Sequence, residues 1–241
     1  MDRGRMPKFM LRFARNQDGG VFVEVAVMMT ILLAFVLGGI DFLFAFYQWN
    51  AASKAVQLGA RIAAVSDPVA QGLTGLTAAL VTGGTCNPGD TMPSFTVTCD
   101  GRTATCTCTG TCTGVSGYSA TAMKKIVYGR NNSGSCNTAG GVYFAGMCNM
   151  FPGLTPDNVK VIYTSAGNAN GGMGYCGRPD GPVPTVQVSL QNQNFTFYFL
   201  GDLMGFRQRQ IGPSATSPTT ATGEALSSCA QNLSGPTGTC P

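Results

Sequence analysis

The most apolar stretch of the sequence sets the first limit on the fold. Residues 25–40 are sixteen consecutive uncharged positions, and apolar side chains predominate over the wider range 21–47, where Glu24 and Asp41 are the charged exceptions. A helix needs about 20 mostly apolar residues to cross the hydrocarbon core of a bilayer. We therefore predict a single membrane-spanning helix over residues 21–47.

The residues on either side of this helix predict its orientation. Residues 1–19 hold five basic and two acidic side chains, a net charge of +3, and such basic segments stay in the cytoplasm. We therefore expect the N-terminus inside the cell and the residues after Asn50 outside the membrane. Aromatic rings favour the membrane–water interface, and they are concentrated at the far end of the apolar stretch, at Phe42, Phe44, Phe46, Tyr47 and Trp49.

The cysteine content predicts that the part after the helix is exported and cross-linked. The chain has ten cysteines and no histidine, and an even number of cysteines in an oxidising compartment is typical of a disulfide framework. A zinc site would need four ligands in spacings such as C-x2-C or mixtures of Cys and His, which the sequence lacks. We predict no metal, and disulfides of open connectivity among Cys86, Cys99, Cys106, Cys108, Cys112, Cys136, Cys148, Cys176, Cys229 and Cys240.

The distribution of charge limits the classes of partner. Charged residues make up 11% of the chain, which is less than half of the roughly 25% usual in globular domains. The formal net charge is +4, but from Asp67 onward there are eight basic and seven acidic residues, so the basic excess lies in the N-terminal part. A surface that binds nucleic acid needs clustered basic residues. We expect no nucleic-acid partner.

Glu24 needs an explanation, because an ionised side chain within a bilayer costs at least about 2.5–3.5 kcal/mol. In one interpretation it lies at the inner interface and extends into water. The other interpretation depends on processing: if the chain is cut between Gly19 and Gly20, Glu24 becomes the fifth residue of the mature protein. A short basic leader, a glycine before the cut, a glutamate at the fifth position and an uninterrupted apolar helix together resemble a type IV prepilin.

That resemblance implies a prepilin peptidase as the processing partner and a role for Glu24 in subunit pairing. The new N-terminal amine of one subunit and the glutamate of its neighbour would neutralise each other, which removes the cost of burying either charge alone. A cut after Gly20 is the alternative, and it would make Glu24 the fourth residue. The count alone favours the cut after Gly19.

Two segments narrow the resemblance. Residues 24–42, EVAVMMTILLAFVLGGIDF, and residues 55–65, AVQLGARIAAV, are similar to the TadE-like family, whose members are pseudopilins or minor pilin-like proteins of the tight-adherence (Flp) pilus machinery. The family typically has a glutamate at the start of the apolar run, a glycine and an acidic residue at its end, and a small-residue helix afterwards. The matching residues here are Glu24, Gly39, Asp41, Gly59, Ala60, Arg61, Ala63 and Ala64. Thr30 stands where the family often has a proline.

Helical periodicity continues beyond the apolar stretch. From Gln48 to Val65 there are few helix breakers, and Pro68 disfavours helix in the residue before it. Small residues recur in this segment at spacings of three and four. Such a stripe allows a second helix to approach closely, and it is equally compatible with a face directed into the protein's own core. Its members are Ala52, Ala55, Gly59 and Ala63.

The remaining patterns predict a small α+β domain. A second helix is expected over residues 118–128, with Ser119 as its cap and Gly129 as its stop. Alternating apolar residues predict strands at 159–164 and 186–191. The apolar run FTFYFL, residues 195–200, predicts a further strand, and the QNQN before it suggests a hairpin with the preceding strand.

The expected organisation has three parts. A basic cytoplasmic leader covers residues 1–19, a transmembrane, pilin-like helix covers residues 20–65, and an exported domain covers residues 66–241. Residues 82–117 have no counterpart in the family and are expected to form a cysteine-rich insertion. The fold class is α+β, with a long, partly transmembrane N-terminal helix followed by a small disulfide-rich domain that contains an antiparallel sheet.

The sequence shows no pattern of residues that is typical of a catalytic site. The chain has no histidine, its acidic residues occur singly, and its glycine-bearing stretches do not match a phosphate-binding loop. We expect no enzyme activity and no cofactor.

The resemblance instead implies a structural or assembly pseudopilin of the bacterial inner membrane, with its C-terminal domain in the periplasm or on an extracellular pilus. Other pilins, pseudopilins and the inner-membrane assembly platform are the implied partners. The alternative is a secreted disulfide-rich binding or adhesion protein with a signal-anchor.

Overall fold

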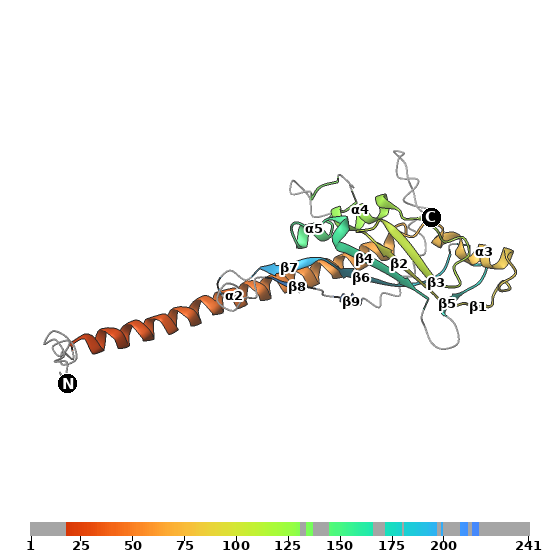
Figure 1. Ribbon diagram of the computed structural model, residues 1–241. Coiled ribbons are helices and arrows are strands. Elements are labelled where there is room, and N and C mark those ends of the chain that lie inside the picture. Colours follow the sequence, from red (N-terminus) through yellow and green to blue (C-terminus); the bar gives the residue numbers. More distant parts are fainter. Residues whose placement is uncertain are drawn as a thin grey trace, which may run out of the picture. The chain divides into compact units, whose positions relative to one another are not determined.

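The computed structural model describes residues 18–130, 134–136, 145–165, 172–179, 181–196, 199, 208–211 and 214–216 (Figure 1). The chain divides into two compact units: Met1–Phe46 with Thr196–Gln208, and Tyr47–Phe195 with Arg209–Pro241. The first unit contains most of the apolar part of the N-terminal helix, and the second contains the main sheet. The predicted leader lies almost entirely outside the described residues.

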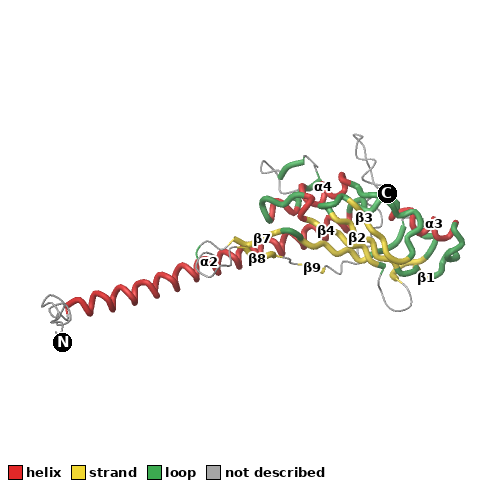
Figure 2. The backbone as a smooth tube through the Cα atoms, viewed as in Figure 1, coloured by secondary structure: helices red, strands yellow, loops and turns green. Residues whose placement is uncertain are grey.

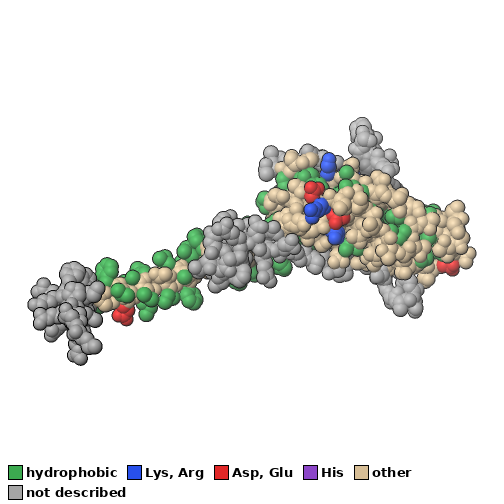
Figure 3. All heavy atoms as spheres, viewed as in Figure 1, with side chains coloured by type: hydrophobic (Ala, Val, Ile, Leu, Met, Phe, Trp, Pro, Cys, Tyr) green, Lys and Arg blue, Asp and Glu red, His purple; other side chains and the backbone are tan. Residues whose placement is uncertain are grey.

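The N-terminal helix α2 spans Asp18–Val65 and is 48 residues long. It contains no proline, and it ends just before the Asp67–Pro68 pair, where the preference of proline for an extended preceding residue predicts a break. The segment Gly19–Val65 is long and apolar enough to cross a membrane, and its most apolar window has a mean hydropathy of 2.5 and no buried residue. Its apolar side chains are therefore directed outward (Figure 3).

Five antiparallel strands form the main sheet, in the order β3-β2-β4-β6-β9. Figure 2 shows the strands in yellow. β2 pairs with β3 on one side and with β4 on the other, so β2 is an interior strand. The predicted strands at 159–164 and 186–191 correspond to β4 and β6. The bounds are β2 Phe95–Asp100, β3 Thr105–Gly110, β4 Val159–Thr164, β6 Thr185–Leu190 and β9 Ser214–Thr216.

One face of this sheet carries the core of the second unit. Residues of β2, β4 and β6 alternate between buried and partly exposed, as expected for an antiparallel sheet that is covered on one side. The buried residues join a single cluster with residues from the second half of α2, from α4 (Ala120–Tyr128) and from α5 (Met147–Met150). Within it, the hydroxyl of Tyr163 accepts a hydrogen bond from the amide of Val69 at 3.0 Å, and burial raises the pKa of this tyrosine.

The second predicted helix is confirmed as α4. The Ser119 side chain caps it by accepting a hydrogen bond from the amide of Ala122 at 3.3 Å, which satisfies one of the first-turn donors. The chain leaves the helix at Gly129, whose φ of 90° suits a residue without a side chain.

Shorter elements complete the described structure. The 3-10 turns η1 (Leu73–Gly75) and η3 (Pro156–Asn158) precede α3 and β4. Helix α3 spans Leu76–Thr82. Strand β1 (Thr91–Met92) pairs with β5 (Gly172–Tyr175), and β7 (Gln193–Thr196) pairs with β8 (Gln208–Ile211).

The predicted hairpin between the last two strands is wrong. The strand β7 begins at Gln193, two residues before the apolar run, and its partner is β8 and not β6. The neighbours of β6 are β4 and β9. The short polar connection suggested a tight turn between neighbours, but Asn192 adopts φ 55° and the chain passes there into a separate two-stranded sheet.

The cysteine-rich segment 82–117 contributes to the core of the second unit. It supplies β2 and β3, and Phe95, Val97 and Cys99 of β2 are almost completely buried. The sequence FTVTCD alternates with period two, as a half-buried strand does. The abundance of cysteine and threonine concealed this pattern.

Four disulfides link eight of the ten cysteines within the described part of the chain, and none of the described cysteines is free. The pairs are Cys86–Cys176, Cys99–Cys106, Cys108–Cys112 and Cys136–Cys148. Cys99 and Cys106 lie directly opposite each other on β2 and β3, with Cα atoms 4.0 Å apart. Cys229 and Cys240 lie outside the described residues. The predicted fold class, a long apolar helix followed by a disulfide-rich domain with an antiparallel sheet, is confirmed.

Candidate assembly site on the apolar helix

The two glycines of the predicted cleavage site lie in the first turn of α2, which begins at Asp18. Both are exposed, and a Cβ atom built on either would meet no atom within 4 Å. The first amides of a helix have no hydrogen-bond partner within the helix. The first turn, which contains the Gly19–Gly20 peptide bond, is therefore held by fewer hydrogen bonds than the turns that follow. This geometry is compatible with proteolysis there, and the cleavage itself stays a prediction.

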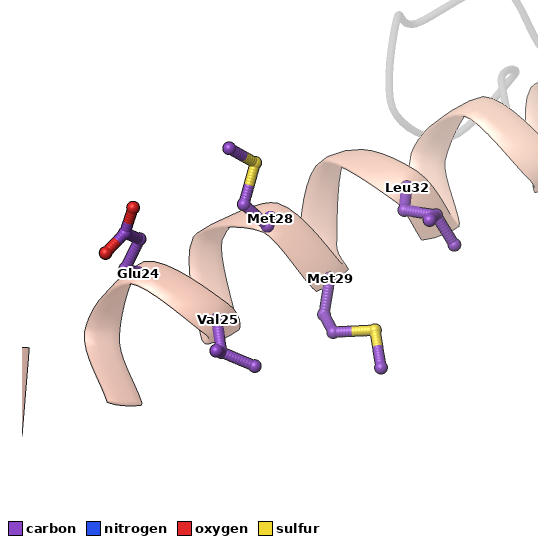
Figure 4. A pocket seen from close by; sticks show the side chains of 5 residues that line it. All are labelled: Glu24, Val25, Met28, Met29 and Leu32. Atoms are coloured by element: carbon purple, nitrogen blue, oxygen red, sulfur yellow. The ribbon is translucent and has the colours of Figure 1, made fainter. Parts of the chain in front are cut away.

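Glu24 lies one turn further along, on a shallow groove in the helix surface that is lined by Glu24, Val25, Met28, Met29 and Leu32. All five residues are exposed. Figure 4 shows the Glu24 carboxylate and Met28 on one side of the helix, with Val25 and Met29 on the other. The carboxylate thus lies on the same side of the helix as Met28, and it forms no ion pair among the residues described.

Chemically, this surface offers one carboxylate within an apolar layer. Methionine side chains adapt to irregular neighbouring surfaces, and an ionised carboxylate within such a layer calls for a cation or hydrogen-bond donors. A partner that brings a positive group and an apolar helix would meet both requirements. The sequence found Glu24 from its position, but it did not single out the two methionines beside it.

Asp41 is the second acidic residue of the apolar stretch, and its surroundings are different. Its side chain is almost fully buried, with 3% exposure, and its Oδ2 accepts a hydrogen bond from the backbone amide of Phe199 at 2.7 Å. Both residues belong to the first unit. The family resemblance pointed to Asp41 as an acidic residue, whereas no feature of the sequence predicted its contact with Phe199.

The predicted small-residue stripe lies within the core of the second unit. Ala52 and Ala55 have no exposed surface, Ala63 is 3% exposed, and Gly59 is also buried. A Cβ atom on Gly59 would overlap the Sδ and Cγ atoms of Met147 in α5. The stripe therefore permits close packing inside the protein itself, with α5 and the buried face of the sheet.

Two lysines of the second unit form ion pairs. Lys125 pairs with Asp67 at 3.2 Å, and Lys160 with Asp100 at 3.7 Å. Partial burial acts to raise the pKa of Asp100, but hydrogen bonds from Gln191 and from backbone amides, together with the nearby Lys160, outweigh it and lower the pKa below 3.8.

Two further observations concern titratable and metal-binding side chains among the described residues. Burial raises the pKa of Tyr118 to about 12, and the charges of Asp157 and Asp100 act in the same direction. The described residues contain no group of three or more His, Cys, Asp or Glu side chains that could hold a metal ion.

The described residues thus contain one apolar helix able to cross a membrane and a disulfide-linked α+β domain. Residues 19–61 of the chain match the model of the family TadE-like protein, so the resemblance drawn from the sequence is confirmed over that segment. The match covers the apolar part of α2, Glu24, Asp41 and the first part of the small-residue stripe. No curated protein and no solved structure matches the chain.

Proposed function

We propose that the protein is a pseudopilin, or minor pilin-like subunit, of a tight-adherence type IV pilus. The observation that carries the proposal is the match of residues 19–61 to the TadE-like family, on a helix whose most apolar window contains no buried residue. An exposed apolar surface of this size needs lipid or other apolar helices around it. The helix of a single-pass membrane subunit is surrounded first by lipid and then, after assembly, by the apolar helices of other subunits.

In this proposal the N-terminus is cytoplasmic, α2 crosses the bacterial inner membrane, and the disulfide-linked unit lies in the periplasm. A prepilin peptidase removes residues 1–19, and the freed amine of one subunit neutralises Glu24 of a neighbour. The groove around Glu24 supports this role, because it places one carboxylate among apolar side chains that can adapt to a second helix. The other partners are pilins, pseudopilins and the inner-membrane assembly platform, and the function is not enzymatic.

The test is the intact mass of the full-length protein after extraction from bacterial membranes that contain a prepilin peptidase. We expect the loss of residues 1–19 and the retention of eight or more oxidised cysteines. Replacement of Gly19 by a bulky residue such as Phe should block the cut, whereas Gly19→Ala should be partly tolerated. A mature N-terminus near Ser53, with the protein in the soluble fraction, would contradict the proposal and support a secreted binding protein.

A further inference from the structure

The outer end of the apolar helix carries an attachment that the family match does not explain. Over residues 21–49 most side chains of α2 are exposed, but a stripe with reduced exposure runs along one face: Leu37, Gly38, Asp41, Ala45 and Gln48. These residues recur at spacings of three and four, which is one side of a helix. Thr196–Gln208 belong to the same compact unit as the apolar helix up to Phe46. Within that range, Phe199 contacts α2 at Asp41.

The hydrogen bond between the Phe199 amide and Asp41 satisfies two groups at once. A buried carboxylate without partners is costly, and backbone amides outside regular structure need acceptors when water is absent. The amide donates to Oδ2 at 2.7 Å, within the range of a strong charge-assisted hydrogen bond. Asp41 is thus positioned to hold an irregular piece of backbone against the helix.

The position of Asp41 along the helix sets the depth of this attachment. At about 1.5 Å per residue, Asp41 lies about 25 Å along the axis from Glu24, and the hydrocarbon core of a bilayer is about 30 Å thick. With Glu24 near the inner boundary, Asp41 and Phe199 lie near the outer one. Aromatic rings concentrate at that level. The Phe199 side chain is 47% exposed, and Phe42 and Phe46 of the same unit are also exposed on α2.

We propose that Asp41 holds the backbone of Phe199 against the outer end of the apolar helix, and that the Phe199 ring contacts lipid in the periplasmic leaflet of the inner membrane. The inference rests on the proposed function only in that α2 crosses this membrane. It gives the protein a second membrane contact, made by a residue that lies 158 positions further along the chain than Asp41. Asp41 acts here as a positioning residue, because it holds the backbone that presents the ring.

Tryptophan fluorescence tests the contact, because the chain has a single tryptophan. The full-length protein carrying Trp49→Phe and Phe199→Trp is reconstituted into vesicles of phosphatidylethanolamine and phosphatidylglycerol, with or without brominated phosphatidylcholine. We expect blue-shifted emission and loss of fluorescence with the brominated lipid. The matched control carries Trp49→Phe and Tyr175→Trp, since Tyr175 is similarly exposed but belongs to the second unit. Its emission should be insensitive to the brominated lipid.

Two substitutions at position 41 test the attachment. Each is added to the protein that carries Trp49→Phe and Phe199→Trp. Asp41→Ala should red-shift the emission and reduce the quenching, whereas Asp41→Asn should retain most of the quenching because its amide oxygen can still accept from the backbone amide of residue 199. Thiol labelling without reduction should find the same oxidised cysteines in both variants, which shows that the disulfide-linked unit is intact. Quenching that is equal in Asp41→Ala and in its parent would overturn the role of Asp41.

A tryptophan in the middle of the apolar stretch separates failure of this inference from failure of the proposed function; it is introduced as Phe35→Trp together with Trp49→Phe, at a side chain that is 80% exposed. If this tryptophan is quenched by brominated lipid but the tryptophan introduced at position 199 is not, the helix is inserted and the lipid contact of position 199 is wrong. If neither is quenched, α2 does not enter the bilayer, and the membrane proposal falls as well. A response of the tryptophan at position 199 to an added pilin but not to lipid would assign the ring to a protein interface and overturn the lipid contact.

Discussion

Glu24 and Asp41 are both carboxylates of one apolar helix, yet their surroundings separate their roles. Glu24 is exposed on a groove that other parts of the described chain leave open, whereas Asp41 is buried and accepts a hydrogen bond from within its own unit. A group whose partner is already supplied by its own chain serves the fold. A group exposed in an apolar layer is available to a second molecule.

The first prediction concerns the effect of replacing Glu24 on assembly. We expect Glu24→Gln to leave membrane level and disulfide formation unchanged but to abolish incorporation into the pilus, because the amine of a neighbouring subunit would lose its counter-charge. Met29→Leu, a nearly volume-conserving change in the same groove, should assemble normally. The measurement is the ratio of pilus-associated to membrane-bound protein. Normal assembly of Glu24→Gln at normal membrane level would leave Glu24 as an interface residue.

Gly59 supports a second prediction, on packing. Gly59→Leu should destabilise the sheet-containing unit by about 1–3 kcal/mol, as overpacking of a core does, because its side chain would collide with Met147. Met147→Ala in the same chain should restore part of the loss. The control is Gly39→Leu, where a Cβ atom meets no neighbour within 4 Å. Urea unfolding measures the difference, and equal midpoints for the Gly59 and Gly39 variants would exclude the proposed collision.

Asp100 gives a third prediction, on pH. Its pKa is lowered in the folded protein, so its ionised form contributes stability above the ordinary value of 3.8, and this contribution is lost as the pH falls through the folded value. Asp100→Asn should therefore flatten the acid side of the stability profile, measured by unfolding temperature against pH. Gln191→Ala removes the hydrogen bond donated at 2.6 Å and should have a smaller effect in the same direction. An unchanged acid slope in Asp100→Asn would contradict the assignment.

Among the elements, those with an uninterrupted pattern were predictable from the sequence. The apolar run and the proline at position 68 gave α2, the serine cap and terminal glycine gave α4, and regular alternation gave β4 and β6. Strand β2 has the same alternation but was missed, because its cysteine was considered only as a disulfide partner. The pairing of β7 with β8 was not predictable, because β8 has the sequence QRQI, which lacks the apolar alternation of a strand.

The candidate site divides in the same way. The spacing between Glu24 and the two glycines before it is a local pattern, so it can be recognised from the sequence alone. The contact of Asp41 with Phe199 spans 158 positions, and nothing in either segment specifies the other. Likewise, the small-residue stripe was recognisable, but only the position of Met147 shows which surface covers Gly59.

The disulfides provide a fourth prediction, at the level of elements. In the chain-entropy model a disulfide stabilises more as the loop that it closes becomes longer, by up to about 4.7 kcal/mol for a loop of about 100 residues. The Cys86–Cys176 bond closes a separation of 90 residues, and the Cys108–Cys112 bond a separation of 4. Replacement of both cysteines by alanine in the first pair should therefore lower the free energy of unfolding more than the same change in the second.

The two double variants are compared by denaturant unfolding without reductant. The Cys108–Cys112 variant serves as the control for the loss of two sulfur atoms. A larger loss in that variant would show that native packing around the sulfurs, and not the length of the closed loop, determines the contribution.

For the whole molecule, a fifth prediction concerns reduction. A domain of this size has a total stability of about 5–15 kcal/mol, and a single disulfide typically contributes about 2–4 kcal/mol. Reduction of the four described bonds should therefore unfold the sheet-containing unit while α2 remains helical in lipid. Circular dichroism in vesicles measures both parts, and thiol labelling before reduction should find almost no reactive cysteine. Stoichiometric zinc bound by free thiolates would contradict this account.

The order of the main sheet has a consequence for how the chain can fold as it emerges. β2 and β3 form a local hairpin, and β4, β6 and β9 then join in the order in which they occur in the sequence, each beside the strand that came before it in the sheet. Each later strand therefore pairs with a strand that has already left the membrane. A chain that is exported from its N-terminus onward could form this sheet by adding strands at one edge, and the earlier strand pairs would not need to rearrange.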